Sequence, residues 1–174
     1  MNRACRPIVR AVCLLFVLVL PLACYAKGKE TKVAAKDVPA AVMNAFHSAY
    51  PSAKIKETTT EAEEGKTYFE IRSKDGDLFR EVSYLADGTV TEVKEAVTEA
   101  ALPATVKAAV EAKYPGAKIG RAAKVVRDAV TTYDLKIVSG KMKMKLVVDP
   151  DGKIISEKES DGKHEKAPAA KGAY

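Results

Sequence analysis

Two stretches of the chain carry an apolar residue at every fourth position, and each stretch lies between two prolines. The recurring residues are Val38, Val42, Phe46 and Tyr50 in the first stretch and Leu102, Val106, Val110 and Tyr114 in the second. This spacing places the apolar side chains on one face of an α-helix. Proline is favoured at the first helical position, and a residue that precedes proline is pushed out of the helical region. The pattern therefore predicts amphipathic helices that begin at Pro39 and Pro103 and end before Pro51 and Pro115.

After each helix the pattern changes to the alternation that is typical of β-strands. Strands are expected at about 53–60, 66–73, 77–85 and 89–94, and again at about 117–125, 130–138, 141–148 and 153–158. Asp87-Gly88 and Asp151-Gly152 indicate tight turns, because glycine adopts the positive φ that such turns require.

Alternation also predicts which strand residues face the helix. In the second half, Met142, Met144, Leu146 and Val148 face one side, and Lys141, Lys143 and Lys145 face the other. In the first half, the residues expected inside are Leu78, Val82, Tyr84, Phe69 and Ile71. Arg80 interrupts this apolar set.

The two halves repeat one sequence, since residues 37–95 recur without a gap as residues 101–159. Tyr50-Pro51 recurs as Tyr114-Pro115, so matched residues lie 64 positions apart. We therefore predict an α+β fold of two tandem repeats, residues 37–96 and 101–159, each with one helix packed on one face of a small antiparallel sheet of three to four strands. Because a unit of about 60 residues buries little surface, we expect the two repeats to pack against each other.

The segments that flank the repeats have a different composition. Three arginines precede an apolar run and a small-residue stretch that ends at Ala26, which predicts a secretory signal peptide over residues 1–26 and no transmembrane segment in the mature chain. Two ways of processing stay open, namely cleavage after Ala26 or lipidation of Cys24 as a new N-terminus. Both predict an exported protein in the periplasm or outside the cell. Residues 27–36 are predicted to be a flexible leader, and residues 160–174 a disordered tail.

Charge and cysteine content exclude several function classes. The formal net charge is +6, and removal of the three signal arginines leaves +3, which is too mild to favour nucleic-acid binding. Cys5, Cys13 and Cys24 all lie in the signal, so the mature chain has neither a disulfide nor a free thiol.

The order of these features resembles a known family. Val38-Pro39, Tyr50-Pro51, Ala53-Lys54-Ile55 and Asp87-Gly88 recur as Leu102-Pro103, Tyr114-Pro115, Ala117-Lys118-Ile119 and Asp151-Gly152. This order is similar to the PepSY-like, β-lactamase-inhibitor-like domains of exported bacterial proteins. The resemblance implies a noncatalytic binding module, inhibitory in some members, with no catalytic residues to carry over. In the inhibitory proteins disulfides link the repeats, and this chain lacks them. The resemblance therefore does not imply inhibition of β-lactamase.

The residues that catalysis or metal binding needs are scarce, so we predict no enzyme activity, no catalytic residue, no metal and no cofactor. His47 and His164 are the only histidines, and His47 is expected on the polar side of its helix. Asp149 and Asp151 resemble the start of a calcium loop, but the remaining ligands are absent and a plain turn is favoured.

The two halves differ on the sheet face that points away from the helices, and this difference predicts a partner-binding face. Its candidate residues are Tyr68, Glu70, Arg72, Phe79 and Glu81 in the first half and Lys136, Lys141, Lys143 and Lys145 in the second. Exposed aromatic side chains favour protein interfaces, and the lysines would attract an acidic partner. The alternative is that Tyr68 and Phe79 are cross-strand neighbours that cover each other, or that they pack on the second repeat.

The predicted function is therefore a noncatalytic exported binding module, inhibitory or regulatory towards an unknown envelope protein or peptide. An alternative is a lipid-anchored structural or surface-attachment protein of the cell envelope. Binding assays on variants of the sheet face would distinguish these two classes.

Overall fold

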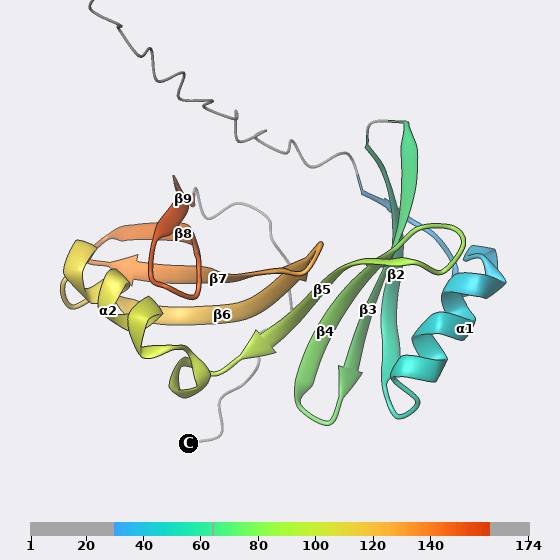
Figure 1. Cartoon of the computed structure of the whole chain (residues 1–174), viewed down its shortest axis with the longest axis horizontal. Helices are drawn as coiled ribbons and strands as arrows, with labels where there is room; N and C mark the ends of the chain where they lie inside the picture. Colours follow the sequence, from blue (N-terminus) through green and yellow to red (C-terminus); the bar gives the residue numbers. More distant parts are fainter. Residues whose placement is uncertain (1–29, 64, 161–174) are drawn as a thin grey trace, which may run out of the picture.

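Strands dominate the architecture of the chain (Figure 1). The structure, a computed structural model, describes residues 30–63 and 65–160. The first half contains β1 (Thr31–Lys32), a 3-10 helix η1 (Ala35–Asp37), α1 (Ala40–Ala49), β2 (Lys54–Glu63), β3 (Lys66–Asp75), β4 (Leu78–Tyr84) and β5 (Val90–Val97). The second half contains η2 (Glu99–Ala101), α2 (Ala104–Lys113), β6 (Lys118–Arg127), β7 (Val130–Ser139), β8 (Met142–Val148) and β9 (Ile154–Glu159).

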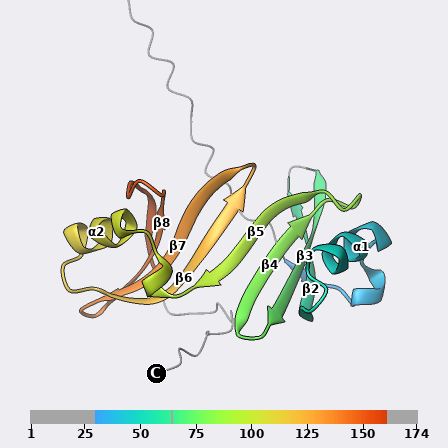
Figure 2. The same cartoon turned by 60° about the horizontal axis from the view of Figure 1, so that its bottom comes forward.

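The predicted fold class is wrong, because the strands form a single sheet and not two small ones. All nine strands are antiparallel neighbours in chain order, from β1 to β9. The two halves join where β5 pairs with β6, from Glu92 opposite Arg127 to Val97 opposite Ala122. β5 runs to Val97, three residues beyond its predicted end, and an exposed strand edge of this length favours pairing with another strand. The halves therefore meet edge to edge in one continuous sheet (Figure 2).

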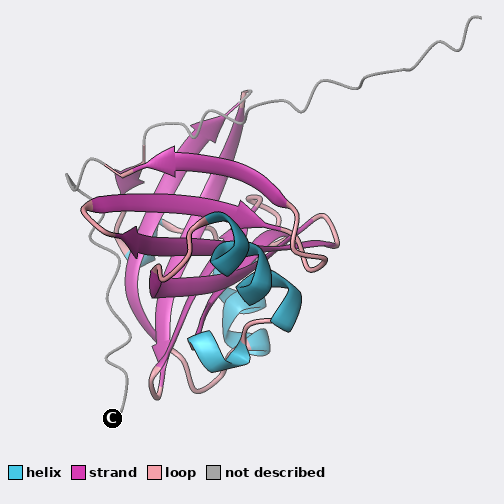
Figure 3. Cartoon of the chain, turned by 90° about the vertical axis from the view of Figure 1, so that its left-hand side faces the viewer, coloured by secondary structure: helices cyan, strands magenta, loops and turns pink. Residues whose placement is uncertain are grey.

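The two α-helices pack on one face of this sheet and cover separate parts of it (Figure 3). α1 buries Val42 and Phe46 against Ile71, Val82 and Tyr84, all of which are fully buried. Below α2, the buried residues are Leu102, Val106, Val110, Ala122, Leu135, Ile137, Leu146 and Val148. Both sets lie on the same face, because Val82 is directly opposite Val93 and Val93 is directly opposite Val126 across the junction. Within the described part of the chain, neither α1 nor α2 packs on the other face of the sheet.

Arg80 occupies a core-facing position because its neighbours compensate its charge. Its guanidinium carbon lies 4.0 Å from the centre of the Tyr50 ring, and its Nε atom donates a hydrogen bond to Glu95 at 2.6 Å. The aliphatic part of arginine can cover apolar surface while the charged end finds such partners. Only a tenth of the Arg80 side chain is exposed.

The Asp-Gly turns approach the helices more closely than the sequence indicates. A Cβ atom on Gly88 would lie 2.8 Å from the Ala41 carbonyl oxygen, and one on Gly152 would lie 2.7 Å from the Thr105 carbonyl oxygen. Both glycines also have positive φ, at 89° and 91°. Each turn therefore needs glycine for its backbone conformation and for its contact with a helix.

The ends of the chain lie largely outside the described residues. The predicted signal peptide with Cys24, and the tail beyond Ser160, are not described. The described part of the predicted leader differs from a free spacer, because Thr31 and Lys32 pair with Thr60 and Thr59 of β2. Within the described ranges, no helix is long and apolar enough to cross a membrane.

Candidate functional site

A groove with a volume of about 1490 Å³ crosses the helix-free face of the sheet. It is lined by side chains from both halves, from Glu57 on β2 to Lys158 on β9. Strand register places two rows of its charged side chains on one face, because each member lies directly opposite its neighbour in the next strand. The rows are Glu57, Arg72, Glu81 and Lys94 in the first half and Arg121, Lys136, Lys145 and Lys158 in the second. The groove is therefore built on the sheet backbone, which fixes where its lining residues project.

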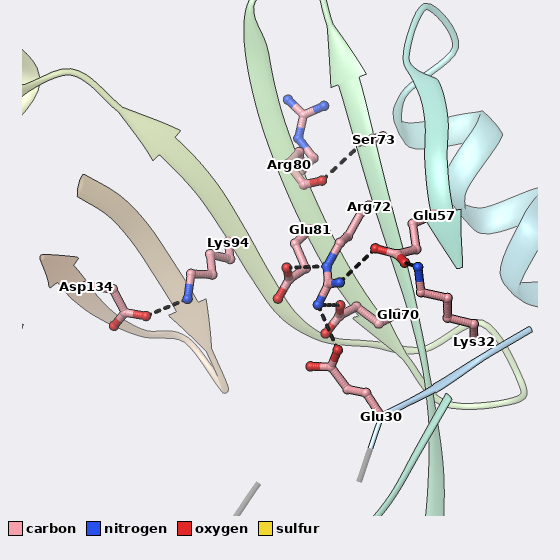
Figure 4. A network of polar contacts seen from close by, with 10 residues as sticks. All are labelled: Glu30, Lys32, Glu57, Glu70, Arg72, Ser73, Arg80, Glu81, Lys94 and Asp134. Atoms are coloured by element: carbon pink, nitrogen blue, oxygen red, sulfur yellow. Dashed lines mark hydrogen bonds and ion pairs between the residues drawn. The ribbon is translucent and has the colours of Figure 1, made fainter. Parts of the chain in front are cut away.

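One end of the groove holds an ionic network around Arg72 (Figure 4). The Arg72 guanidinium donates from Nε to Glu81 at 2.9 Å, from Nη1 to Glu57 at 2.9 Å and from Nη2 to Glu30 at 3.0 Å. Nη2 also lies 2.7 Å from a carboxylate oxygen of Glu70. Four carboxylates thus surround one guanidinium.

The electrostatics of this network favour the charged forms of Arg72 and Glu57. Burial acts to lower the pKa of Arg72, but the charges of Glu70 and Glu81 and the hydrogen bonds to Glu81 and Glu57 outweigh it and raise that pKa. Hydrogen bonds from Lys32 and Arg72 lower the pKa of Glu57 below its usual 4.5. Lys32 binds the far oxygen of Glu57 at 2.5 Å, so strand β1 is tied into the network.

A second ion pair links the two halves in the middle of the groove. The Lys94 Nζ atom on β5 donates to the Asp134 carboxylate on β7 at 2.6 Å, across the intervening strand β6. Burial acts to lower the pKa of Lys94, but the charge and hydrogen bond of Asp134 outweigh it and raise that pKa. About a third of each side chain is exposed, so we expect a modest contribution to stability.

Five of the predicted binding residues line this groove, namely Arg72, Phe79, Glu81, Lys136 and Lys145. Glu70 lies behind them, almost fully buried against Arg72. Lys141 lies in the turn between β7 and β8, and Lys143 lines a separate pocket of about 200 Å³ beside Val138 and Met144.

Tyr68 and Phe79 are not cross-strand neighbours. Tyr68 is directly opposite Glu61, whereas Phe79 is directly opposite Lys74, six positions further along β3. At about 3.4 Å per residue this separates them by about 20 Å. The Lys74 ammonium lies 5.2 Å from the centre of the Phe79 ring, so Phe79 is covered by a lysine of its own half.

Several charged groove residues were missed from the sequence, among them Glu57, Lys94, Arg121 and Lys158. β6 has an irregular register between Ile119 and Arg121, which breaks the alternation that would have placed Arg121 on this face. β5 and β9 are the last strands of each half, and their faces depend on a pairing that the sequence pattern does not show. The 64-residue spacing matches Arg121 to Glu57 and Lys158 to Lys94, but none of these four residues was placed on this face from the sequence.

The other residues considered as metal ligands or catalytic groups are not grouped into a site in the described part of the chain. Among the described residues, no three or more His, Cys, Asp or Glu side chains are grouped so that they could hold a metal ion. His47 is exposed on α1, and His164 lies outside the described residues. The Asp149 carboxylate accepts hydrogen bonds from the backbone N–H groups of Asp151 and Lys153 at 3.0 and 2.8 Å, which is the geometry of a turn.

Comparisons with solved structures show the same fold in several proteins of Bacteroides. A BLIP-like protein from Bacteroides fragilis is 20% identical, with a TM-score of 0.55, and the match covers 73% of this chain and 92% of that one. Proteins described as "putative periplasmic proteins" from Bacteroides eggerthii are 16% identical, with a TM-score of 0.60 and coverage of 70% and 88%. A DUF2874 family protein from Bacteroides uniformis is 18% identical, with a TM-score of 0.58 and coverage of 70% and 88%.

Comparison of the sequence with curated proteins and with families gives two further results. No curated protein matches the chain. The family described as "Putative beta-lactamase-inhibitor-like, PepSY-like" matches residues 24–77 and 67–156, which is most of the chain. The resemblance that the recurring motifs predicted is confirmed, and the chain belongs to this PepSY-like, β-lactamase-inhibitor-like family.

Proposed function

We propose that this protein is a noncatalytic binding module of the cell envelope that holds another protein in the groove on the helix-free face of its sheet. The observation that carries the proposal is the groove itself, which crosses both halves of the sheet and has a volume of about 1490 Å³. A rigid sheet that presents fixed side chains loses little conformational entropy when a partner binds.

The composition of the groove supports a protein partner. Phe79, Ala96 and Val147 supply apolar surface, and the ion pairs around Arg72 and Lys94 supply oriented charge. Protein interfaces combine apolar contact with oriented polar groups in this way. Membership of a family described as inhibitor-like supports the same reading, and binding to an envelope protein would make the module inhibitory or regulatory.

Export to the periplasm or the cell surface is part of the proposal. The arginines and apolar run before Ala26 support a signal peptide, and a solved protein of the same fold is described as periplasmic. Lipidation at Cys24 would tether the module to a membrane and leave the groove open for its partner.

Site-specific photo-crosslinking in the cell that encodes the protein tests the proposal. A photoreactive residue is placed at Ala123, which lines the groove, and as a matched control at Ala112, which is exposed on α2. We expect a discrete adduct with one envelope protein from position 123 and none from position 112. Adducts from position 112 alone, or none from either position, would refute the groove as a binding site.

A further inference from the structure

The internal repeat of the chain extends further towards the N-terminus than the two α-helices. The 3-10 helix η1 lies 64 positions before η2, and Thr31 of β1 lies 64 positions before Glu95 of β5. Thr31 is directly opposite Thr60 on β2, and Glu95 is directly opposite Lys124 on β6, which again lies 64 positions later. β1 therefore occupies on β2 the place that β5 occupies on β6.

β1 covers only a short part of the β2 edge. It pairs with Thr59 and Thr60, and the Val33 N–H beside it donates to the Thr58 carbonyl at 3.1 Å. β5, in contrast, pairs with six residues of β6. Each further cross-strand pair adds to the stability of a sheet, so a longer strand in the same place would compete with β1.

The opposite end of the sheet carries a strand of the β5 type with an open edge. β9 starts 64 positions after β5, and within the described ranges it pairs with β8 alone. The Ser160 N–H donates to the Lys143 carbonyl on β8 at 2.6 Å. Because alternate residues of a strand bond to opposite sides, the N–H and C=O groups of Glu159 point away from β8. Unpaired groups of this kind favour the addition of another strand.

A second copy of the chain offers a strand that matches this edge. In the register of the β5–β6 junction, Lys158 of one copy would be directly opposite Glu61 on β2 of the other, and Glu159 would be opposite Thr60. The first pair joins opposite charges, which favours the pairing. Pairing of β9 with a second β9 about a two-fold axis is less suitable, because registers centred on Glu157, Lys158 or Glu159 place like charges opposite each other.

We propose that β9 of one copy pairs with β2 of a second copy in the register of the β5–β6 junction, and that β1 is a cap that competes with β9 for this place. The contact joins two different edges, so it is head to tail and forms longer chains unless it closes into a ring. In the capped molecule the β2 edge is occupied, and the protein is monomeric. Release of β1 exposes the β2 edge and promotes association. This inference goes beyond the proposed function and does not depend on it.

The decisive variant releases β1 from β2 and leaves both pairing strands unchanged. Thr31→Pro with Val33→Pro removes the N–H groups that point to β2, because proline has no N–H. We call this the uncapped variant. The matched control is Lys32→Pro, because the Lys32 N–H points away from β2. Thermal unfolding checks that both variants of the full chain fold.

Sedimentation equilibrium measures the association. We expect the unaltered chain and the control to be monomeric where the uncapped variant forms dimers and longer species, with association at least about tenfold tighter. A synthetic peptide of residues 27–36 contains β1, and we expect it to refill the β2 edge and dissociate the assembled variant. An uncapped variant that stays monomeric, or a closed dimer that the peptide does not dissociate, would overturn the proposal.

Glu159→Pro tests the β9 edge in the uncapped variant, with Glu159→Ala as the matched control. Both remove the same exposed carboxylate, but only proline removes the N–H on the open edge. We expect Glu159→Pro to weaken association about tenfold or more and Glu159→Ala to change it by less than about threefold. Equal effects of the two substitutions would overturn the proposal.

The unaltered full chain at its highest soluble concentration gives a second measurement, which decides the matter if the uncapped variant does not fold. We expect weak association that Glu159→Pro removes and Glu159→Ala keeps. In that case, a chain that does not associate, or one whose association Glu159→Pro leaves unchanged, would overturn the proposal.

Discussion

Replacement of Arg72 by alanine tests whether the ionic network holds the first half of the sheet together. The substitution leaves Glu30, Glu57, Glu70 and Glu81 around an empty position, and Glu70 is only 6% exposed. Breaking a buried pair costs about 3–5 kcal/mol, and an exposed pair about 0.2–1 kcal/mol. Because about a quarter of the Arg72 side chain is exposed, we expect the free energy of unfolding to fall by about 2–4 kcal/mol at pH 7.

The pH dependence of this loss distinguishes electrostatics from packing. In the unaltered chain, the pKa of Glu57 is lower in the folded state than in the unfolded state. Its contribution to stability is therefore fully present above the pKa of the unfolded state and is lost as the pH falls through the pKa of the folded state. In the variant, the crowded carboxylates raise one another's pKa, so the variant gains stability as they become protonated. The difference between the two proteins should therefore shrink as the pH falls from 7 to about 4.

Urea unfolding at several pH values measures this difference, with Lys136→Ala as the matched control. Lys136 stands at the corresponding position of the second half, directly opposite Arg121 and Lys145. Ion pairs at partly exposed positions contribute about 0–1 kcal/mol, so we expect its removal to change the free energy of unfolding by no more than about 1 kcal/mol. A loss for Arg72→Ala below about 1 kcal/mol at pH 7, or a loss that stays constant down to pH 4, would refute the reasoning.

The remaining predictions concern the core and the turns. Gly88→Ala and Gly152→Ala should each lower the free energy of unfolding by more than about 2 kcal/mol, because a Cβ atom would combine a positive φ with a clash against a helix carbonyl. Gly140 also has a positive φ, but the space around it is open, so Gly140→Ala should lower the free energy of unfolding by about 1 kcal/mol. Equal losses at all three glycines would contradict the contact between the Asp-Gly turns and the helices. Phe46→Ala should lower the free energy of unfolding by about 3–5 kcal/mol, because Phe46 is fully buried. His47→Ala should lower it by less than about 0.5 kcal/mol, because His47 is exposed. Chemical denaturation measures both values, and similar losses would contradict the assigned helix face.

The elements of the fold could be predicted from the sequence because they depend on local patterns. The four-residue spacing and the prolines predicted helices that lie within one residue of Ala40–Ala49 and Ala104–Lys113 at their starts. Strands β2 to β9 lie within about three residues of the predicted ranges, whereas β1 was not predicted, and the Asp-Gly turns have the expected positive φ. These features need only neighbouring residues to form.

The arrangement of the elements could not be predicted, because it depends on contacts between distant residues. The pairing of β5 with β6 joins residues about 30 positions apart and leaves no separate mark in either strand. Arg80 seemed misplaced in the core, and only the ring of Tyr50 and the carboxylate of Glu95 explain its position. The groove was half predicted, since the lysines of β7 and β8 were identified while Arg121, beyond the irregularity of β6, was not.

The two halves of the groove place different charges at matched positions of one strand register. In the first half, every nitrogen of the Arg72 guanidinium is bound by a carboxylate of the same chain, so little of its charge is available to a ligand. The matched positions of the second half are Arg121, Lys136, Lys145 and Lys158, which are also directly opposite one another but do not repeat the carboxylates of the first half. The register is therefore common to both repeats whereas the charge order is not, so the backbone pairing of the sheet does not depend on one particular order of charges along this row.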